Sequence, residues 1–268
     1  MKSRILPGFR LSLTYTLIYL GLIVIIPLIA LLANITINIS AIIEIVSDER
    51  LVSALFLSLR TAFISSFINA ICGLAITWTL VRYKFPGRQV LDAMIDLPFA
   101  LPTAVAGIAF TALYAPNGWI GSFFSSIDIK IAFTEVGIIL VLIFIGLPFV
   151  IRTLQPVLQD LDKSLEEAAY SLGASKFQTF FRIIFPSLLP ALLTGFALSF
   201  ARTLGEYGSV IFIAGNIPNK TEIVPLLIMT KLEQFDYIGA SVIGAMMLVI
   251  SFIMLLIINS LQSWAGKK

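Results

Sequence analysis

The feature that most constrains this chain is a series of apolar runs, each long enough to cross a lipid bilayer. The first run, residues 11–33, contains 23 residues without a charge; as a helix it is about 35 Å long, whereas a hydrocarbon core is about 30 Å thick. Comparable runs predict six transmembrane helices, over residues 11–33, 54–81, 91–115, 132–153, 188–214 and 237–262. We therefore predict an all-α, polytopic membrane domain over residues 11–262, with short tails at 1–10 and 263–268.

Composition agrees with a membrane protein and excludes several other classes. Charged residues make up 12% of the chain and hydrophobic residues 59%, whereas a soluble domain carries about 25% charged residues. The net charge is +3, but the basic residues lie in short clusters between apolar runs, so we expect no nucleic-acid partner. The chain has no His and a single Cys, Cys72, which excludes an internal disulfide, a thiolate cluster and a His-based metal site. We expect neither a metal nor a cofactor in this chain.

The basic residues also predict which side of the membrane the termini occupy. Six spans place both termini on one side, and that side carries twelve basic residues against four on the other. The twelve are Lys2, Arg4, Arg10, Arg82, Lys84, Arg88, Arg152, Lys163, Lys176, Arg182, Lys267 and Lys268; the four are Arg50, Lys130, Lys220 and Lys231. Because basic residues are enriched in cytoplasmic loops, we expect both termini in the cytoplasm or in the stroma. No cleavage site or transit peptide is expected, so a bacterial inner membrane and a plastid envelope membrane both stay open.

Prolines interrupt two of the predicted spans. Pro98 and Pro102 lie four residues apart in the third span, and Pro148 interrupts the fourth. A broken helix at membrane depth survives only where other protein covers it or where it lines a wet cavity. The alternative interpretation is an ordinary proline kink packed against neighbouring helices.

A segment in which polar residues alternate with apolar ones, residues 154–187, follows the fourth span and leads into the fifth. Leucines recur at helical spacing in its first half and predict an amphipathic helix outside the membrane: Leu154, Leu158, Leu161, Leu165 and Leu172. Ser164 and Glu167 fit a capping box at an internal helix start, and Gly173 is a plausible stop.

The second half of the segment predicts another helix directly after the glycine. Ser175 and Gln178 repeat the capping-box spacing, and Pro186 is expected to close the helix. Its apolar stripe is aromatic, with Phe177, Phe180, Phe181 and Ile184. A helix, a glycine turn and a helix could either rest on lipid headgroups or dock a soluble partner.

The sequence EAAYSLGASKFQTFFRIIFP, residues 167–186, resembles the EAA motif of permease subunits of ABC importers. The positions in register are Glu167, Ala168, Ala169, Gly173, Ile183 and Pro186. The sequence departs from the motif at Phe185, where the pattern has Leu. The resemblance implies two coupling helices that sit in a groove of a cytoplasmic ATPase, with Glu167 contacting the ATPase and Gly173 making the bend.

The resemblance also implies partners. The chain contains no G-x-x-x-x-G-K-[ST] sequence, the pattern that cradles nucleotide phosphates, so we do not expect this chain to be an enzyme. ATP hydrolysis is expected on two copies of a separate ABC ATPase. The family implies a second permease, forming a heterodimer, and an external solute-binding protein, although a homodimer stays open.

Three further stretches, residues 101–121, 201–222 and 231–245, resemble the T-type permease of sulfate/thiosulfate importers. Together with the motif, the resemblance covers roughly residues 11–262, and it implies that the second permease is of the W type and that the external partner is a sulfate-binding protein. Molybdate permeases share the element at Leu204–Gly208, so a molybdate permease stays an alternative. An ion-coupled secondary transporter fits less well, since there is no His and no evident inverted repeat, and a membrane enzyme fits least.

Four residues are candidates for the pathway. Arg202 and Glu206 lie four residues apart in the fifth span and predict an ion pair, which either fastens the bundle or lines the cavity and re-pairs as the anion passes. Arg60 either snorkels outward or contacts substrate. Thr103, beside the break at Pro102, could offer donors to an oxyanion. Asp92 and Asp96 are interpreted as interfacial or helix-start carboxylates.

Overall fold

The computed structural model describes residues 8–33 and 45–265, and these are helical without a strand. The helices in chain order are α1 Phe9–Leu20, α2 Ile26–Ala33, α4 Glu49–Arg82, α5 Arg88–Ile95, α6 Leu97–Ala100, α7 Thr103–Tyr114, α8 Trp119–Ser125, α9 Glu135–Asp160, α10 Lys163–Ser171, α11 Lys176–Thr179, α12 Phe185–Leu204, α13 Val210–Ala214, α14 Val224–Glu233 and α15 Tyr237–Ala265. Two π-helical turns, Gly21–Ile25 and Phe180–Ile184, join α1 to α2 and α11 to α12. The predicted all-α class is confirmed.

Five helical stretches of the described residues are long and apolar enough to cross a membrane. They are Phe9–Ala33, Glu49–Arg82, Glu135–Asp160, Lys176–Leu204 and Tyr237–Ser260. They correspond to the first, second, fourth, fifth and sixth predicted spans, with shifted ends. The predicted third span is not among them, so the count of six stays a prediction.

The third predicted span, residues 91–115, is broken into α5, α6 and α7. Leu101 has extended backbone angles and Pro102 occupies the N-cap of α7, because a proline has no N–H to continue a helix and disfavours helical angles at the residue before it. The fourth span behaves differently: α9 runs without a break through Pro148 and Pro156. The predicted interruption at Pro148 is therefore wrong, because Pro148 is buried inside a continuous helix.

The centre of the bundle is a seam of small and polar residues where α4, α9 and α12 meet. Asn69 of α4 donates to Ser199 of α12 at 3.3 Å, and Gly146 of α9 faces both side chains. A Cβ at Gly146 would lie 2.4 Å from Ser199 Oγ and 2.6 Å from Asn69 Nδ2. Lipid offers no hydrophobic force between helices, so close backbone approach and interhelical hydrogen bonds must hold the seam together.

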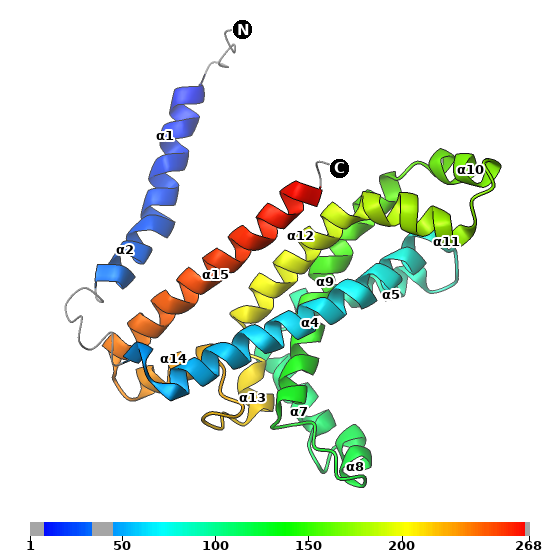
Figure 1. Ribbon diagram of the computed structural model, residues 1–268. Helices are drawn as coiled ribbons and strands as arrows, with labels where there is room; N and C mark the ends of the chain where they lie inside the picture. Colours follow the sequence, from blue (N-terminus) through cyan, green and yellow to red (C-terminus); the bar gives the residue numbers. More distant parts are fainter. Residues whose placement is uncertain (1–7, 34–44, 266–268) are drawn as a thin grey trace.

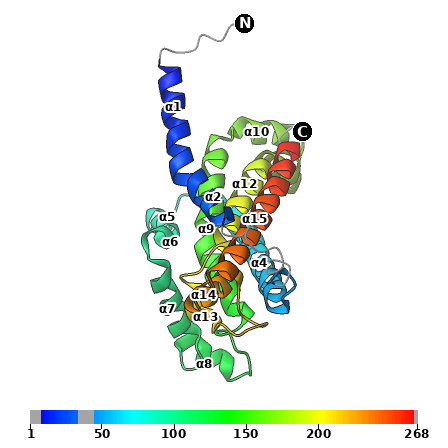
Figure 2. The same cartoon turned by 90° about the vertical axis from the view of Figure 1, so that its left-hand side faces the viewer.

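The first span stands beside the bundle. None of the residues of α1 and α2 is buried. Figure 1 shows these helices apart from the bundle, while in Figure 2, seen from their own side, α2 lies in front of it; α2 contacts α15. Both views place the start of α1, the end of α15 and α10 toward one end of the molecule, and α8 toward the other. The first turn of α1 and the last turn of α15 therefore lie at the same end of the molecule as α10.

The seam yields a test of helix packing. Gly146→Ala should lower the free energy of unfolding by about 1–3 kcal/mol, because the added Cβ overlaps two buried polar side chains. Gly244→Ala on α15 is the matched control, since a Cβ there meets nothing within 4 Å and alanine favours the helix. Equal unfolding of the two variants in detergent would contradict this description of the seam.

Candidate coupling segment and pathway

Helix α10 starts at an aspartate cap. The carboxylate of Asp162 accepts the Ser164 backbone N–H at 2.9 Å, and this hydrogen bond lowers the pKa of Asp162. The cap is therefore fully present above the ordinary pKa of an aspartate and is lost only as the pH falls through the lowered value. The predicted capping box at Ser164 and Glu167 is wrong, because Asp162 occupies the N-cap and Ser164 already lies inside the helix.

The turn after α10 requires a glycine. Gly173 has a φ of 83°; its N–H donates to the Tyr170 carbonyl at 2.9 Å, and the Ala174 N–H donates to the Ala169 carbonyl at 3.0 Å. These two bonds make a Schellman motif, which ends a helix with a left-handed residue. A side chain at Gly173 meets nothing within 4 Å, so the constraint is the backbone angle and not space.

The second arm is not a separate helix. Ser175 and Gln178 form the predicted capping box, but α11 then continues through a π-helical turn into α12. Pro186 lies in the first turn of α12, and the Phe185 N–H just before it donates to the Phe180 carbonyl, so the wider turn carries the helix past the proline. The prediction that Pro186 closes the second helix is wrong.

The leucine stripe also belongs to two helices. Leu154 and Leu158 are buried in the last turns of α9, whereas Leu165 and Leu172 are exposed on or next to α10. The predicted single amphipathic helix from Leu154 is therefore wrong. The chain turns at residues 161–162, between α9 and α10.

An aromatic and charged contact ties both arms to the end of α4. Arg82 pairs with Glu166 of α10 at 2.5 Å, and its guanidinium lies 5.5 Å from the centre of the Trp78 ring. The Trp78 ring meets Phe180 of the second arm edge to face at 5.5 Å. Nothing in the sequence predicted this pair, because Arg82 and Glu166 are far apart along the chain.

The remaining motif residues differ in solvent exposure. Ala169 is buried and Ile183 half-buried, while Glu167, Ala168 and Gly173 are exposed. In the described part of the chain the Glu167 carboxylate has no hydrogen bond or ion pair. The segment thus presents one free carboxylate on a helix whose neighbour, Glu166, is already bound.

The aromatic stripe is divided in the same way. Phe177 is 71% exposed and Phe181 49%, whereas Ile184 is buried. The rings of Phe177 and Phe181 lie 4.4 Å apart. The second arm therefore exposes an apolar contact surface of its own.

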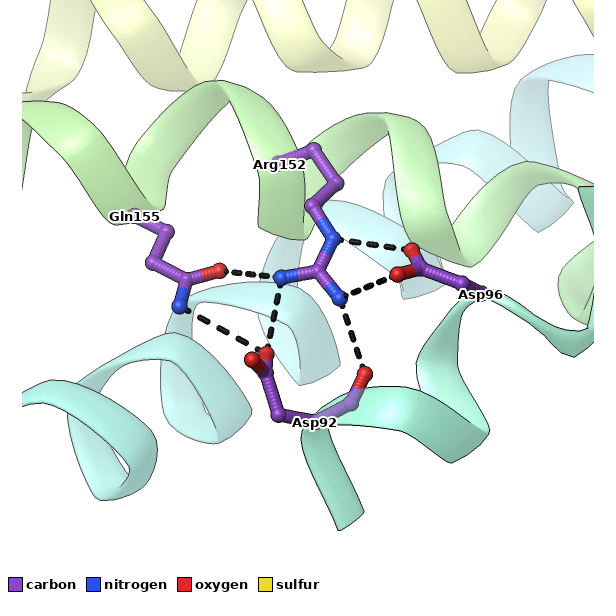
Figure 3. Close-up of polar contacts among 4 residues, drawn as sticks. All are labelled: Asp92, Asp96, Arg152 and Gln155. Atoms are coloured by element: carbon purple, nitrogen blue, oxygen red, sulfur yellow. Dashed lines mark hydrogen bonds and ion pairs between the residues drawn. The ribbon is translucent and has the colours of Figure 1, made fainter. Parts of the chain in front are cut away.

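A second polar cluster joins α9 to α5 (Figure 3). Arg152 donates through Nε and Nη2 to both carboxylate oxygens of Asp96, at 2.8 and 2.7 Å. Its Nη1 reaches Asp92 Oδ1 at 2.7 Å and Gln155 Oε1 at 2.6 Å, and Nη2 also reaches the Asp92 carbonyl at 2.8 Å. Asp92 and Asp96 were predicted as interfacial or helix-start carboxylates and Arg152 as a cytoplasmic charge, but their contact was not predicted.

The Arg202–Glu206 pair is present at the end of α12. The two side chains approach to 2.6 Å, and Glu206 Oε1 also accepts the Ser209 N–H at 3.0 Å and the Ser209 hydroxyl at 2.9 Å. Helix α12 ends at Leu204 and α13 begins at Val210. The predicted continuous span 188–214 is therefore wrong, and Arg202 lies in the last turn of the helix and not midway along it.

The two helix breaks meet. A Cβ at Gly208 would lie 2.3 Å from Thr103 Oγ1, and one at Gly107 would lie 2.3 Å from the Ser209 carbonyl. The start of α7 therefore rests directly on residues 205–209. Thr103, Arg202 and Glu206 belong to this double break, and the glycines at 205 and 208 were the sequence signal for it.

Arg60 does not belong to the double break. It pairs with Glu135 in the first turn of α9, and its guanidinium lies 5.4 Å from the centre of the Phe56 ring. Arg50 makes a similar link, binding the buried Glu222 through two nitrogens at 2.6 and 2.7 Å. Both pairs fasten the start of α4 to other elements, and neither Glu135 nor Glu222 was predicted as a partner.

Residues 70–268 match the family described as binding-protein-dependent transport system inner membrane component, a match over well more than half of the chain. The chain belongs to this family. Its relatives in the family include the sulfate transport system permease protein CysT of Synechocystis, which is 50% identical over 253 residues, covering 94% of this chain and 88% of that protein. The protein of the same name in Escherichia coli is 46% identical over 268 residues, covering 100% and 97% of the two chains.

The fold also agrees with a solved ABC transporter. A bacterial ABC transporter involved in the import of the acidic polysaccharide alginate has a chain that superposes with a TM-score of 0.79 over 95% of this chain and 94% of that one. At 15% identity the similarity concerns the fold alone. The family match, the named relatives and the apolar helices together identify this chain as a multi-pass permease subunit of an ABC transporter.

The double break yields a test of its ion pair. Arg202→Gln should lower the free energy of unfolding by about 3 kcal/mol, because Glu206 would stay buried without a counter-charge. Changing both residues to Gln should recover part of that loss, and Lys220→Gln on an exposed loop is the control. If Arg202→Gln unfolds at the same temperature as the control, the pair does not fasten the break.

Proposed function

We propose that this chain is the membrane permease subunit of an ATP-driven importer of sulfate and thiosulfate. The names of its relatives support the substrate class. The observation that carries the coupling role is the arrangement of the segment: α10 is bound to α4 through Glu166, the Glu167 carboxylate has no partner among the described residues, and Phe177 and Phe181 of the second arm are exposed. A free carboxylate and an apolar surface on one segment suit a basic, partly apolar groove on a soluble partner.

The partner is an ABC ATPase in two copies, which supplies the hydrolysis that this chain has no phosphate-binding loop to perform. A second permease of the W type completes the pathway, and an external sulfate-binding protein delivers the anion. The permease itself uses no cofactor. Its termini and α10 face the cytoplasm of a bacterium or the stroma of a plastid.

The double break is the candidate for the route of the anion. Arg202 keeps 37% of its side chain exposed, while Thr103 and the first turn of α7 lie against residues 205–209. The Arg202–Glu206 pair opens or re-pairs as the dianion passes, and Thr103 offers a neutral donor. Arg60 lies outside this route, since Glu135 already binds it.

The two neighbouring glutamates of α10 allow a matched test of docking. Glu167→Gln should weaken the binding of the ATPase about ten-fold, because it removes a charge-assisted contact. Glu166→Gln should leave ATPase affinity closer to the parent, because Glu166 faces Arg82 and not the partner. Co-purification and titration with the separately expressed ATPase measure both, and loss of affinity in Glu166→Gln alone would overturn the assignment.

The turn at Gly173 allows a test of coupling. Gly173→Val should abolish ATP-dependent uptake while the chain still inserts into the membrane, because a β-branched residue cannot adopt a φ of 83° without strain. Gly173→Asn is the control, since asparagine tolerates this angle. Normal uptake by the valine variant would show that the turn is not needed.

Substrate identity is tested by uptake. Cells that lack their own sulfate importer should take up labelled sulfate, and take it up only with ATP, when supplied with this chain and its three proposed partners. Unlabelled thiosulfate should block the uptake and molybdate should not. Uptake blocked chiefly by molybdate would leave the permease role standing and would show that the substrate is molybdate and not sulfate.

A further inference from the structure

Helices α5 and α6 are attached to the bundle at few points. Neither helix has a buried residue, and a cavity of about 420 Å³, lined by Ile76, Leu91 and Met94 among others, separates α5 from α4. Their contacts with α9 are specific: Arg152 binds Asp92 and Asp96, and the Phe99 ring meets the Phe149 ring edge to face at 5.2 Å. The position of the pair α5–α6 is therefore set by α9.

The geometry of the cluster fixes the orientation of α5 relative to α9 as well as the distance between them. Arg152 forms a two-pronged contact with Asp96, two bonds to Asp92 through its carboxylate and its backbone carbonyl, and a bond to Gln155 one turn along its own helix. A guanidinium fork suits this planar arrangement, whereas a lysine ammonium offers a single point of charge. Because the side chains of Asp92 and Asp96 are 37% and 48% exposed, the pairs contribute little to stability. Their main effect is positional.

On one side, the cluster connects to α10. Arg152 lies eight residues, or about 12 Å along a helix, from the end of α9 at Asp160, and α10 begins at Lys163. Pro156 stands four residues after Arg152, so the backbone hydrogen bond to the Arg152 carbonyl is missing. The last turns of α9 can therefore bend at the residue that holds α5.

On the other side, the cluster connects to the double break. Asp96 precedes α6, which ends at Ala100, and the extended residue Leu101 leads directly to Thr103 at the start of α7. Thr103 lies against Gly208. A displacement of α5 and α6 thus has a short covalent path to the point where the two breaks meet.

We infer that Arg152 is a positioning residue that makes α5 and α6 move with α9 and α10, so that motion of the coupling segment reaches the break at Leu101 and Pro102. This inference rests on the proposed function. Arg152 touches no transported ion in this scheme; it acts through Asp92 and Asp96. The quantity it sets is the number of anions moved per ATP hydrolysed.

The test is a coupling ratio in the reconstituted complex. Proteoliposomes containing this chain, the W-type permease and the ATPase, with sulfate-loaded binding protein outside, give ATP hydrolysis and labelled sulfate uptake in one sample. Arg152→Lys and Asp96→Asn should keep normal assembly and at least half of the ATPase rate, while sulfate moved per ATP falls about ten-fold. Arg88→Gln is the control, since Arg88 lies on α5, the helix that carries Asp92, and has no carboxylate partner among the described residues.

Charge exchange separates positioning from a general structural role. The double variant Arg152→Asp with Asp96→Arg restores an ion pair between the same two elements. Its ratio of sulfate moved to ATP hydrolysed should be several-fold higher than that of Asp96→Asn. An unchanged ratio in Arg152→Lys, or a parallel loss of ATPase activity and uptake in that variant, would overturn the inference. A parent complex that moves no sulfate would instead overturn the proposed function.

Discussion

Much of the structure depends on ion pairs made by five arginines of α4, α9 and α12. A charge taken out of water is costly unless it finds a counter-charge or reaches the surface. In the described part of the chain these five arginines bind carboxylates: Arg50, Arg60, Arg82, Arg152 and Arg202. Most of these bonds join different elements, so the requirement for neutrality also decides which helices are fastened together.

The pairs act on a centre that is already rigid. The seam between α4, α9 and α12 brings backbones close through Gly146 and buries Asn69 and Ser199, which leaves those helices little freedom to slide. The peripheral helices have more freedom to move: α10 is joined to α4 by the Arg82–Glu166 ion pair, and α5 is joined to α9 by the ion pairs of Arg152. A transporter of this family needs such a division, because a rigid body transmits motion only where it meets parts that can move against it.

The sequence predicted what local pattern controls and missed what distant contacts control. Apolar runs gave five of the spans, and the Gly173 turn and the Ser175 box follow from residues within one turn. The fifth span was predicted to run past the real end of α12, because hydropathy does not register the helix-breaking glycines Gly205 and Gly208 or the hydrogen bond that the Ser209 N–H donates to Glu206. The Arg152 cluster could not be predicted, since its partners lie 56 and 60 residues away.

The most direct test of this account is a pair of spin-label distances in the complete complex, with Cys72 replaced by Ser. One pair joins Lys163→Cys on α10 to Gln89→Cys on α5; the other joins Gln89→Cys to Ser122→Cys on α8, across the break at residues 101–102. When the complex is trapped with ATP bound, we expect the first distance to stay constant and the second to change. A change in the first distance, or none in the second, would mean that α5 does not carry the motion of α10 to the break.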